Sequence, residues 1–437
     1  MLKEKNAPLV CKFGGTSVGT APSIRRVCEI IQEERPSFVV VSAVAGVTDL
    51  LEEFCRASVE QRAPLAALVR EKHEPIAKEL GVEIPLESFL EPLRRFEKIE
   101  DLTQEDQAEI LAIGEDLSAA LIRSYCCANV LQLEQLEARR VIFTNSQFLR
   151  AEPNLALMQT MWGELALKED AIYLMQGFLG ATVSGKTTVL GRGGSDFSAS
   201  LVGELCEARE LRIYTDVCGV YTADPKMLKD TQLIDSLTFE EMQGLASSGA
   251  KVLHQDMLKP CIRAKIPIFV TSMFNSTKEG TWICASLNEA MEGPVIKAVS
   301  LKANQALWFV KYHSSLVRLE DVLGCVRSLG AVPGVVMAQN CGAYFTVDWE
   351  EDSRLMAGAL KEFGEVSCEG PLSLVALVGA QLASWSMTGV FDALQGTPVL
   401  CWSQTDTVIN LIINKESGVV VTKLLHDYVL GLNRSGL

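Results

Sequence analysis

The sequence lacks the patterns that mark a metal-binding or disulfide-linked protein. No Cys-x-x-Cys spacing occurs among its thirteen cysteines, and their only close pair is Cys126-Cys127. The four histidines lie far apart in the chain, so we expect no zinc site. Most of the cysteines stand in apolar or small-residue surroundings, which is typical of buried free thiols in a reducing compartment.

The chain is also short of positive charge and of long apolar runs. Forty Lys and Arg stand against 55 Asp and Glu, which gives a net charge of -15. A surface of this sign repels nucleic acid and anionic membranes, so neither is expected as a partner. Residues 1–5 lead into no apolar signal-peptide core, and no later run is long enough to span a bilayer. We therefore expect a cytoplasmic protein that binds anions only through local clusters of cations and backbone N–H groups.

Two common nucleotide-binding motifs are absent as well. No Gly-x-Gly-x-x-Gly with a following acidic residue occurs, which argues against a nicotinamide-dependent dehydrogenase. There is no Walker A loop, because Lys12 precedes the glycines of its turn. What the chain has is Lys12-Phe13-Gly14-Gly15-Thr16-Ser17-Val18-Gly19, directly after a short buried strand at residues 9–11. Such a turn presents a cation and several donors at one point, and by itself it fits a tight structural turn as well as an anion site.

The order of elements indicates an α/β fold followed by a smaller α+β region. Periodicity predicts a helix over residues 22–34 and a buried parallel strand over residues 38–43, which places the loop 42–48 beside the first turn. Further helices are predicted over residues 50–59, 65–80, 86–98 and 106–126, and further strands over residues 138–144, 171–175, 187–190 and 212–216. From about residue 297 the chain repeats a small module of strands and helices in two copies.

A second glycine turn, Gly191-Arg192-Gly193-Gly194-Ser195-Asp196, follows a β-branched strand and precedes a predicted helix. Bare backbone N–H groups at a helix N-terminus favour an anion, and one guanidinium suits a carboxylate held by two parallel hydrogen bonds. Asp196 also fits a plain N-cap position. A cap alone does not explain the arginine and the glycines before it.

Other polar residues interrupt apolar segments. Glu115 and Asp116 stand in an otherwise apolar helix. For Asp116 we favour a solvent-facing position, whereas Glu115 fits a cleft that holds a substrate ammonium as well as it fits the surface. Thr215-Asp216 at a strand end, and Tyr221 with Asp224-Pro225-Lys226 beyond it, fit a nucleotide site and also fit ordinary turns.

Together with Gly249-Ala250-Lys251-Val252-Leu253-His254, these motifs closely resemble those of the aspartate kinases in the amino-acid kinase superfamily. The match covers nearly the whole chain in the right order. The resemblance implies a three-layer α/β amino-acid kinase fold with a mainly parallel central sheet over residues 1–297. It also implies a regulatory region over residues 298–437 with two α+β ACT (ferredoxin-like) domains, at about 302–366 plus 417–437 and at about 370–416.

In that family, MgATP phosphorylates the β-carboxylate of aspartate to give 4-phospho-aspartate and ADP, the first step of lysine, threonine and methionine biosynthesis. The resemblance implies that Lys12 contacts the transferring phosphoryl group and that Asp196 holds the Lys12 ammonium. It implies that Arg192 binds the substrate α-carboxylate and Glu115 its α-ammonium. The other implied substrate residues are Ser42, Ala43, Thr48, Gly193 and Ser195. The implied ATP site comprises Lys12, Gly14, Gly15, Thr16, Ser17, Thr215, Asp216, Tyr221, Lys226 and Lys251.

Magnesium is expected to be held mainly through ATP phosphates, with no protein-only metal site. The ACT domains imply a homodimer and leave room for an amino-acid effector. Three departures from the family pattern stand out: Lys226 where arginine is common, Gln255 where proline is common, and Gly330-Ala331-Val332-Pro333-Gly334 where many relatives have a Ser-Val-Asp turn that binds an inhibiting amino acid. Without that hydroxyl and carboxylate, lysine should inhibit weakly or not at all.

Two alternatives to an aspartate kinase are weighed. A kinase for glutamate or acetylglutamate would share the fold but lack the paired C-terminal repeats and the Lys-Phe-Gly-Gly-Thr-Ser start. An amino-acid-sensing protein with an inactive kinase domain has no reason to keep Lys12, Glu115, Arg192 and Asp196 together.

Overall fold

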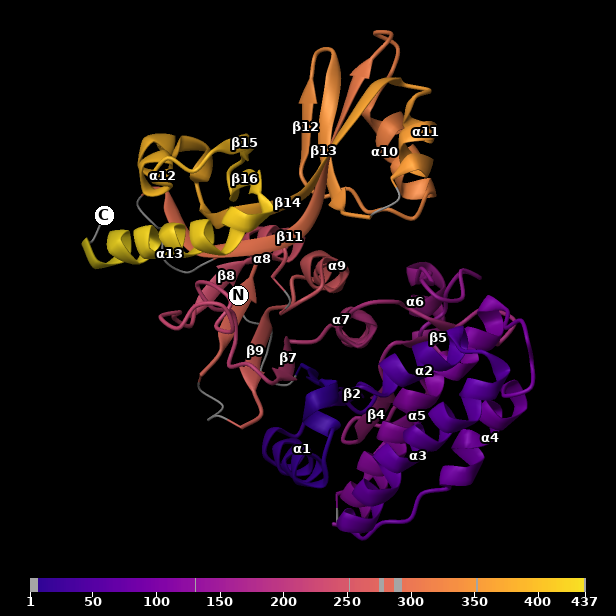
Figure 1. Ribbon diagram of the computed structural model, residues 1–437. Coiled ribbons are helices and arrows are strands. Elements are labelled where there is room, and N and C mark those ends of the chain that lie inside the picture. The colour runs from indigo at the N-terminus through magenta and orange to yellow at the C-terminus, as the bar shows by residue number, and fades with distance from the viewer. Residues whose placement is uncertain are drawn as a thin grey trace. The chain divides into compact units, whose positions relative to one another are not determined.

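The computed structural model describes residues 7–129, 131–250, 252–274, 279–286, 293–350 and 353–435 (Figure 1). The chain divides into two compact units. The first consists of residues 1–220, 235–239 and 253–286, and the second consists of residues 221–234, 240–252 and 287–437. Two segments before residue 297 are thus grouped with the C-terminal region.

A mainly parallel eight-stranded sheet forms the centre of the first unit, in the order β3-β4-β2-β1-β7-β9-β10-β8. Its pairs are parallel except for β9 with β10. The strands are β1 (Leu9–Phe13), β2 (Phe38–Val41), β3 (Leu133–Leu136), β4 (Ile172–Gln176), β7 (Glu210–Thr215), β8 (Ser236–Thr238), β9 (Ile268–Ser272) and β10 (Thr281–Cys284). Since β1 is buried along its whole length between β2 and β7, the turns after these three strands meet at one edge of the sheet.

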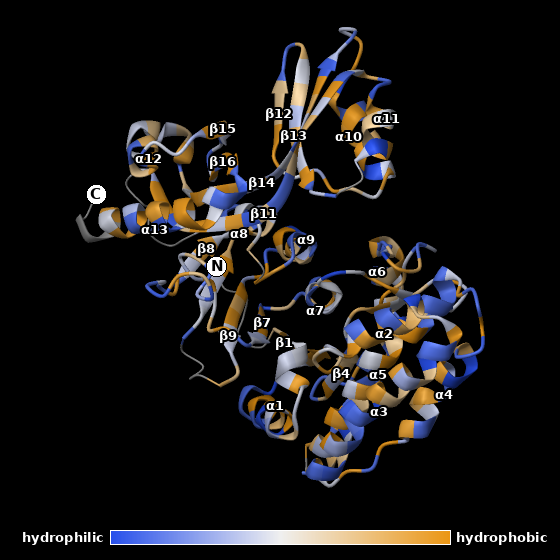
Figure 2. Cartoon of the chain, viewed as in Figure 1, coloured by the Kyte–Doolittle hydropathy of each residue, from blue (hydrophilic) through white to orange (hydrophobic). Residues whose placement is uncertain are grey.

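Helices and a short hairpin complete the first unit. The hairpin pairs β5 (Leu179–Ala181) with β6 (Thr187–Val189). The helices are η1 (Gly15–Val18), α1 (Ala21–Glu34), α2 (Val47–Arg56), α3 (Val59–Leu80), α4 (Leu86–Phe96), α5 (Gln104–Ala128), η2 (Ala138–Arg140), α6 (Leu155–Gly163), α7 (Gly194–Leu205) and α9 (Gln255–Ala264). α2, α3, α4 and α5 pack side by side, and Figure 2 shows hydrophilic residues along much of α3.

The predicted α/β class and the long helices are confirmed. The strand predicted over residues 138–144 is wrong at its start, and at its end Phe143 and Thr144 form only isolated bridges, with Ala181 and Pro153. Residues 138–140 form the 3-10 turn η2 instead, and the neighbouring strand is β3. The Ala138 carbonyl accepts hydrogen bonds from the N–H groups of Val141 and Ile142, and the Ala138 N–H donates to the Gln176 side chain at 3.2 Å. These groups are therefore not available to a strand ladder.

The second unit is built on a six-stranded antiparallel sheet in the order β12-β13-β11-β14-β16-β15. Its strands are β11 (Val295–Tyr312), β12 (Val336–Gln339), β13 (Gly342–Asp348), β14 (Gly364–Ala380), β15 (Val399–Gln404) and β16 (Val408–Asn414). Its helices are α8 (Phe239–Ser247, which begins in the first unit), α10 (Leu319–Ser328), α11 (Arg354–Leu360), η3 (Leu382–Ser384), α12 (Met387–Ala393), η4 (Lys415–Ser417) and α13 (Gly418–Ser435).

The long strands β11 and β14 run through two modules, each with its own apolar core. Trp308, Phe345 and Leu360 belong to the first core, which packs α10 and α11 against the sheet. The second core joins Ile296 of β11 to residues of β14, β16, α12 and α13. The predicted repeat is thus present, since each module has four strands and two helices.

The grouping of residues 417–437 with residues 302–366 is wrong. The C-terminal helix α13 places Val421, Leu425 and Val429 in the second core, with Ile409 of β16. The first half of β11 supplies the fourth strand of the second module. Both helices of that module, α12 and α13, come from residues after 380.

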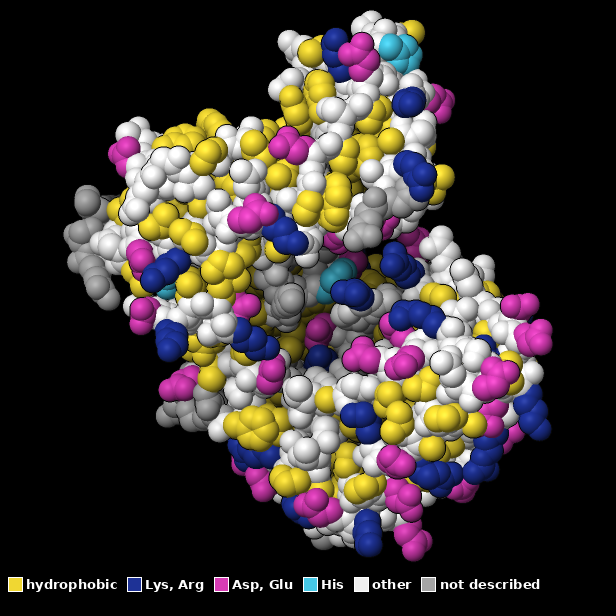
Figure 3. Space-filling model, viewed as in Figure 1, with side chains coloured by type: hydrophobic (Ala, Val, Ile, Leu, Met, Phe, Trp, Pro, Cys, Tyr) yellow, Lys and Arg dark blue, Asp and Glu magenta, His cyan; other side chains and the backbone are white. Residues whose placement is uncertain are grey.

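Charged side chains of both signs are scattered over the face seen in Figure 3, among hydrophobic and other side chains. Several exposed arginines have acidic partners, such as Arg56 with Glu52 at 2.7 Å and Arg95 with Glu109 at 2.6 Å. Within the described part of the chain, no helix combines the length and the apolar character that crossing a membrane requires.

Candidate active site

A buried ion pair lies at the end of the central strand. The Lys12 ammonium on β1 is 2.6 Å from a carboxylate oxygen of Asp196 in the first turn of α7. The Lys12 residue is 7% exposed, so this cation is largely withdrawn from water but still reachable. Asp196 is not the N-cap, because Gly193 occupies that position and α7 begins at Gly194. Its carboxylate is thus a partner for Lys12.

The first glycine turn and the loop after β2 are joined directly. A Cβ atom at Gly15 would lie 2.9 Å from the Ala43 carbonyl oxygen, so only glycine allows this approach. The Ser42 N–H donates to the Phe13 carbonyl at 3.1 Å, and the Ala45 N–H donates to the Gly15 carbonyl at 3.2 Å. The structure therefore brings Ser42 and Ala43 next to the glycine turn, with Thr48 partly exposed in the first turn of α2.

The two hydroxyl residues of the turn differ in their surroundings. Thr16 is exposed. Ser17 is buried, and its hydroxyl donates to the Tyr214 carbonyl at 3.3 Å. In this conformation Ser17 ties η1 to β7, and its hydroxyl is directed at protein rather than at an open space.

Glu115 is a buried carboxylate beside the same loop. It is 3% exposed, and its Oε2 has no hydrogen-bond partner among the described residues. Burial raises the pKa of Glu115 to about 8, although a hydrogen bond from the Ala43 N–H and the Lys12 charge act in the opposite direction. A Cβ at Gly114 would lie 2.8 Å from the Ala43 Cβ, so the glycine allows α5 to approach this closely. An unpaired buried carboxylate of this kind is suited to a ligand ammonium.

The second glycine turn is shaped by backbone that only glycine adopts easily. Gly193 has φ = 69°, and a Cβ there would lie 2.6 Å from the Cβ of His254. Ser195 is buried against Gly177. Arg192 is exposed and forms no ion pair with any residue that the structure describes, so its guanidinium is available to a ligand.

The end of β7 lies beside the ends of β1 and β2, at the same edge of the sheet. Thr215 ends β7, and its hydroxyl donates to the Asp216 carboxylate at 3.1 Å. The Gly14 N–H donates to the Tyr214 carbonyl at 3.1 Å, which places these residues next to the glycine turn. Tyr221 and Lys226 belong to the second unit, where Lys226 is exposed, and Lys251 lies outside the described residues.

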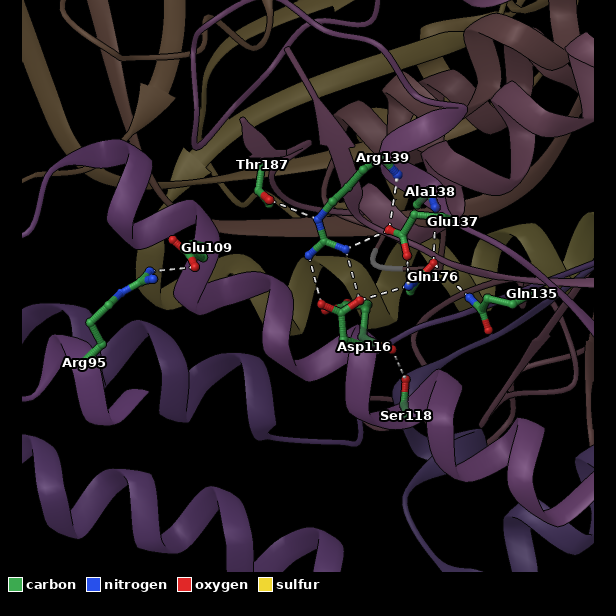
Figure 4. A network of polar contacts seen from close by, with 11 residues as sticks. Arg95, Glu109, Asp116, Ser118, Gln135, Glu137, Ala138, Arg139, Gln176 and Thr187 are labelled. Atoms are coloured by element: carbon green, nitrogen blue, oxygen red, sulfur yellow. Dashed lines mark hydrogen bonds and ion pairs between the residues drawn. The ribbon is translucent and has the colours of Figure 1, made fainter. Parts of the chain in front are cut away.

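The expected solvent-facing position of Asp116 is wrong. Its carboxylate pairs with Arg139 and accepts a hydrogen bond from Gln176 (Figure 4). Sequence reasoning missed Arg139 and Gln176 altogether. Arg139 stands between Glu137 and Arg140, so no local signal sets it apart, and no spacing rule links residues of different elements.

The binding elements fit a nucleotide with its metal ion held through phosphates. Lys12 and the N–H groups of the glycine turns offer positive charge and donors at one edge of the sheet. Among the described residues no group of three or more His, Cys, Asp or Glu side chains is arranged to hold a metal ion.

Comparisons with known proteins agree with this geometry. Residues 7–272 match the amino acid kinase family. The chain is 81% identical to an aspartokinase of Chlamydia muridarum over the full length of both proteins. It is similar to E. coli aspartokinase III in complex with aspartate and ADP, with a TM-score of 0.86, 27% identity, and coverage of 97% of this chain and 100% of that one. The same E. coli enzyme in complex with lysine and aspartate gives a TM-score of 0.75 at 27% identity, over 96% of this chain and 99% of that one. The chain therefore belongs to the amino acid kinase family and, within it, to the aspartokinases.

Proposed function

We propose that this aspartokinase transfers the γ-phosphate of MgATP to the β-carboxylate of L-aspartate, giving 4-phospho-L-aspartate and ADP. The observation that carries the proposal is the buried Lys12–Asp196 ion pair in the same unit as the unpaired buried carboxylate of Glu115. The ion pair holds Lys12 as a fixed cation for a phosphoryl group, and Glu115 supplies an anion for an amino group. The reaction would feed the synthesis of lysine, threonine and methionine in the cytoplasm.

Catalysis in this proposal depends on charge that is in place before the reaction. As the phosphoryl group moves, negative charge spreads over its oxygens, and a preorganised cation lowers the energy of that arrangement. Lys12 is already held by Asp196, so little reorganisation is needed. The N–H group of Gly15 and the hydroxyls of Thr16 and Ser17 are the proposed further donors, with Ser17 released from Tyr214. Gly14, whose N–H bonds the Tyr214 carbonyl, is proposed to keep the space next to the Lys12 ammonium open for the phosphates. Magnesium, when bound with ATP, would neutralise phosphate charge.

The substrate is proposed to be held at both ends of its amino-acid part. Arg192 binds the α-carboxylate through its planar fork, and Glu115 binds the α-ammonium. Ser42, Ala43, Thr48, Gly193 and Ser195 line the remaining substrate contacts. Thr215, Asp216, Tyr221, Lys226 and Lys251 are the proposed nucleotide residues.

Regulation is the finer part of the proposal. We assign residues 1–297 to the kinase domain and residues 298–437 to two ACT domains that form a homodimer and accept an amino-acid effector. Lysine is bound in the structure of the E. coli relative. Here Ala331 and Pro333 flank Val332, where the Ser-Val-Asp turn of many relatives has its hydroxyl and its carboxylate. Weak inhibition by lysine, or none, is therefore expected.

The proposal is tested by ADP release from purified protein against a panel of amino acids. Hydroxylamine is added to trap an acyl phosphate as the hydroxamate, which separates transfer to a carboxylate from plain ATP hydrolysis. The expected result is release with L-aspartate and little with L-glutamate. Lys12→Met should lower kcat by at least about a hundredfold with an unchanged circular dichroism spectrum. Normal turnover in the folded variant, or no aspartate-dependent hydroxamate from the unmodified protein, would refute it.

A further inference from the structure

A network of polar side chains connects α5 to η2, β3, β4 and β6 of the first unit (Figure 4). Its centre is Arg139, whose guanidinium pairs in two places with Asp116, at 3.1 and 2.9 Å. The same guanidinium donates to the Glu137 carboxylate at 2.8 Å and to the Thr187 hydroxyl at 3.0 Å. All three nitrogens of Arg139 therefore have partners, on three different segments.

Gln176 at the end of β4 extends the network. Its amide nitrogen donates to Asp116 at 2.9 Å and to Glu137 at 3.1 Å. Its amide oxygen accepts from the Ala138 N–H at 3.2 Å and from the Gln135 side chain at 3.3 Å. Gln176 is 4% exposed, so this fully bonded amide fixes the end of β4 relative to α5 and η2.

Each anchor of the network is a near neighbour of a proposed substrate residue. Asp116 directly follows Glu115 on α5. Gln176 precedes Gly177, where a Cβ would lie 2.5 Å from the Cβ of Ser195. Thr187 begins β6, the strand that leads into the turn carrying Arg192. The network thus joins the element that presents Glu115 to the two segments that support the Arg192 turn.

We propose that Arg139 is a positioning residue that fixes the separation between Glu115 and Arg192, the groups that bind the ammonium and the carboxylate of the amino-acid substrate. The inference rests on the proposed function. A substrate that carries both an ammonium and a carboxylate binds well only if Glu115 and Arg192 are held at a fixed separation, and a small misplacement of bound groups reduces rates strongly. If the network served stability alone, it would not require these polar residues, since well-packed apolar residues often replace a buried ion pair without loss of stability.

The planar fork of Arg139 gives the network its geometry. Lysine would keep the charge but could not bridge Asp116 in two places while reaching Thr187. Arg139→Lys therefore tests placement with the charge retained, and Arg139→Met tests removal of the charge. The double variant Arg139→Met with Asp116→Leu removes both charges, so no unpaired Asp116 is left buried.

The experiment measures KM for aspartate, KM for ATP, kcat and the melting temperature of these variants. We expect the KM for aspartate to rise about tenfold or more in all three, with the KM for ATP within about twofold of the unmodified value. The double variant should recover the melting temperature lost in Arg139→Met without recovering the KM for aspartate. Arg95→Met is the matched control. Arg95 on α4 forms an ion pair with Glu109, which lies on α5 as Asp116 does, and its replacement should leave both KM values unchanged.

A normal KM for aspartate in a folded Arg139→Lys variant, or in the folded double variant whatever its melting temperature, would overturn the inference. If Arg139→Met does not fold, the lysine and double variants decide. The unmodified protein separates this result from the proposed function, because absence of aspartate-dependent hydroxamate there refutes the function itself.

Discussion

Replacing Glu115 by glutamine should stabilise the ligand-free protein at alkaline pH and weaken aspartate binding. The carboxylate is buried, and its Oε2 has no partner among the described residues. Its charge is therefore costly until a substrate ammonium arrives. Glutamine keeps the shape and removes the charge, so stability and binding should change in opposite directions.

The magnitude follows from the pKa of Glu115, which burial raises from an ordinary value of 4.5 to about 8. Between these pH values the folded chain holds a proton that the unfolded chain has released. The free energy of unfolding therefore falls as the pH rises through this window, by about 1.4 kcal/mol per unit. The full cost is on the order of 5 kcal/mol once Glu115 ionises. The advantage of the glutamine variant should grow from near zero at the acidic end to a few kcal/mol at the alkaline end.

The assay compares melting temperatures of the variant and the unmodified protein across this pH range, since a chain of two units need not unfold in one step. Glu109→Gln, at an exposed position of α5, is the control and should show no widening difference. Aspartate binding should release a proton below about pH 8, measurable by calorimetry in two buffers. Its affinity should fall by at least about tenfold in the Glu115 variant. A melting-temperature difference that does not change with pH would refute the reasoning.

The remaining predictions concern catalysis, regulation and the nucleotide loop. Asp196→Asn should lower kcat by at least about a hundredfold with little change in circular dichroism, because Lys12 loses its anionic partner; near-normal turnover would contradict this. Lysine should leave ADP release almost unchanged; strong inhibition of the unmodified protein would show that the turn around Val332 binds lysine. His426→Ala should raise the KM for ATP severalfold and leave the KM for aspartate unchanged. The reason is that Thr222, which follows the proposed nucleotide residue Tyr221, loses the 2.8 Å contact of its hydroxyl with the His426 ring. An unchanged KM for ATP would exclude this link between α13 and the loop that carries Tyr221 and Lys226.

Much of the fold could be predicted because the signals are local. A run that is apolar on both faces identified β1 and β2 as central strands, and a stripe of helical period identified α5. Helix starts depend on the capping residue. The helix after the second glycine turn, α7, begins at Gly194 because Gly193, and not Asp196, is its N-cap. The strand predicted over residues 138–144 failed at its start because the backbone turns into η2 there, and the Ala138 N–H bonds the Gln176 side chain.

The sequence by itself determined the elements, the glycine turns and the residue types that can hold a phosphate or an amino acid. Composition and spacing are enough for this, since they act within a few residues. Only the tertiary structure decided which charges meet. The family resemblance implied the pair of Lys12 with Asp196, but no spacing rule gives it; it forms because β1 lies centrally in the sheet and α7 starts at its edge. Asp116 is anchored by Arg139 rather than exposed, and α13 completes the second module rather than the first, because burial of apolar faces and pairing of buried charges depend on how distant elements pack.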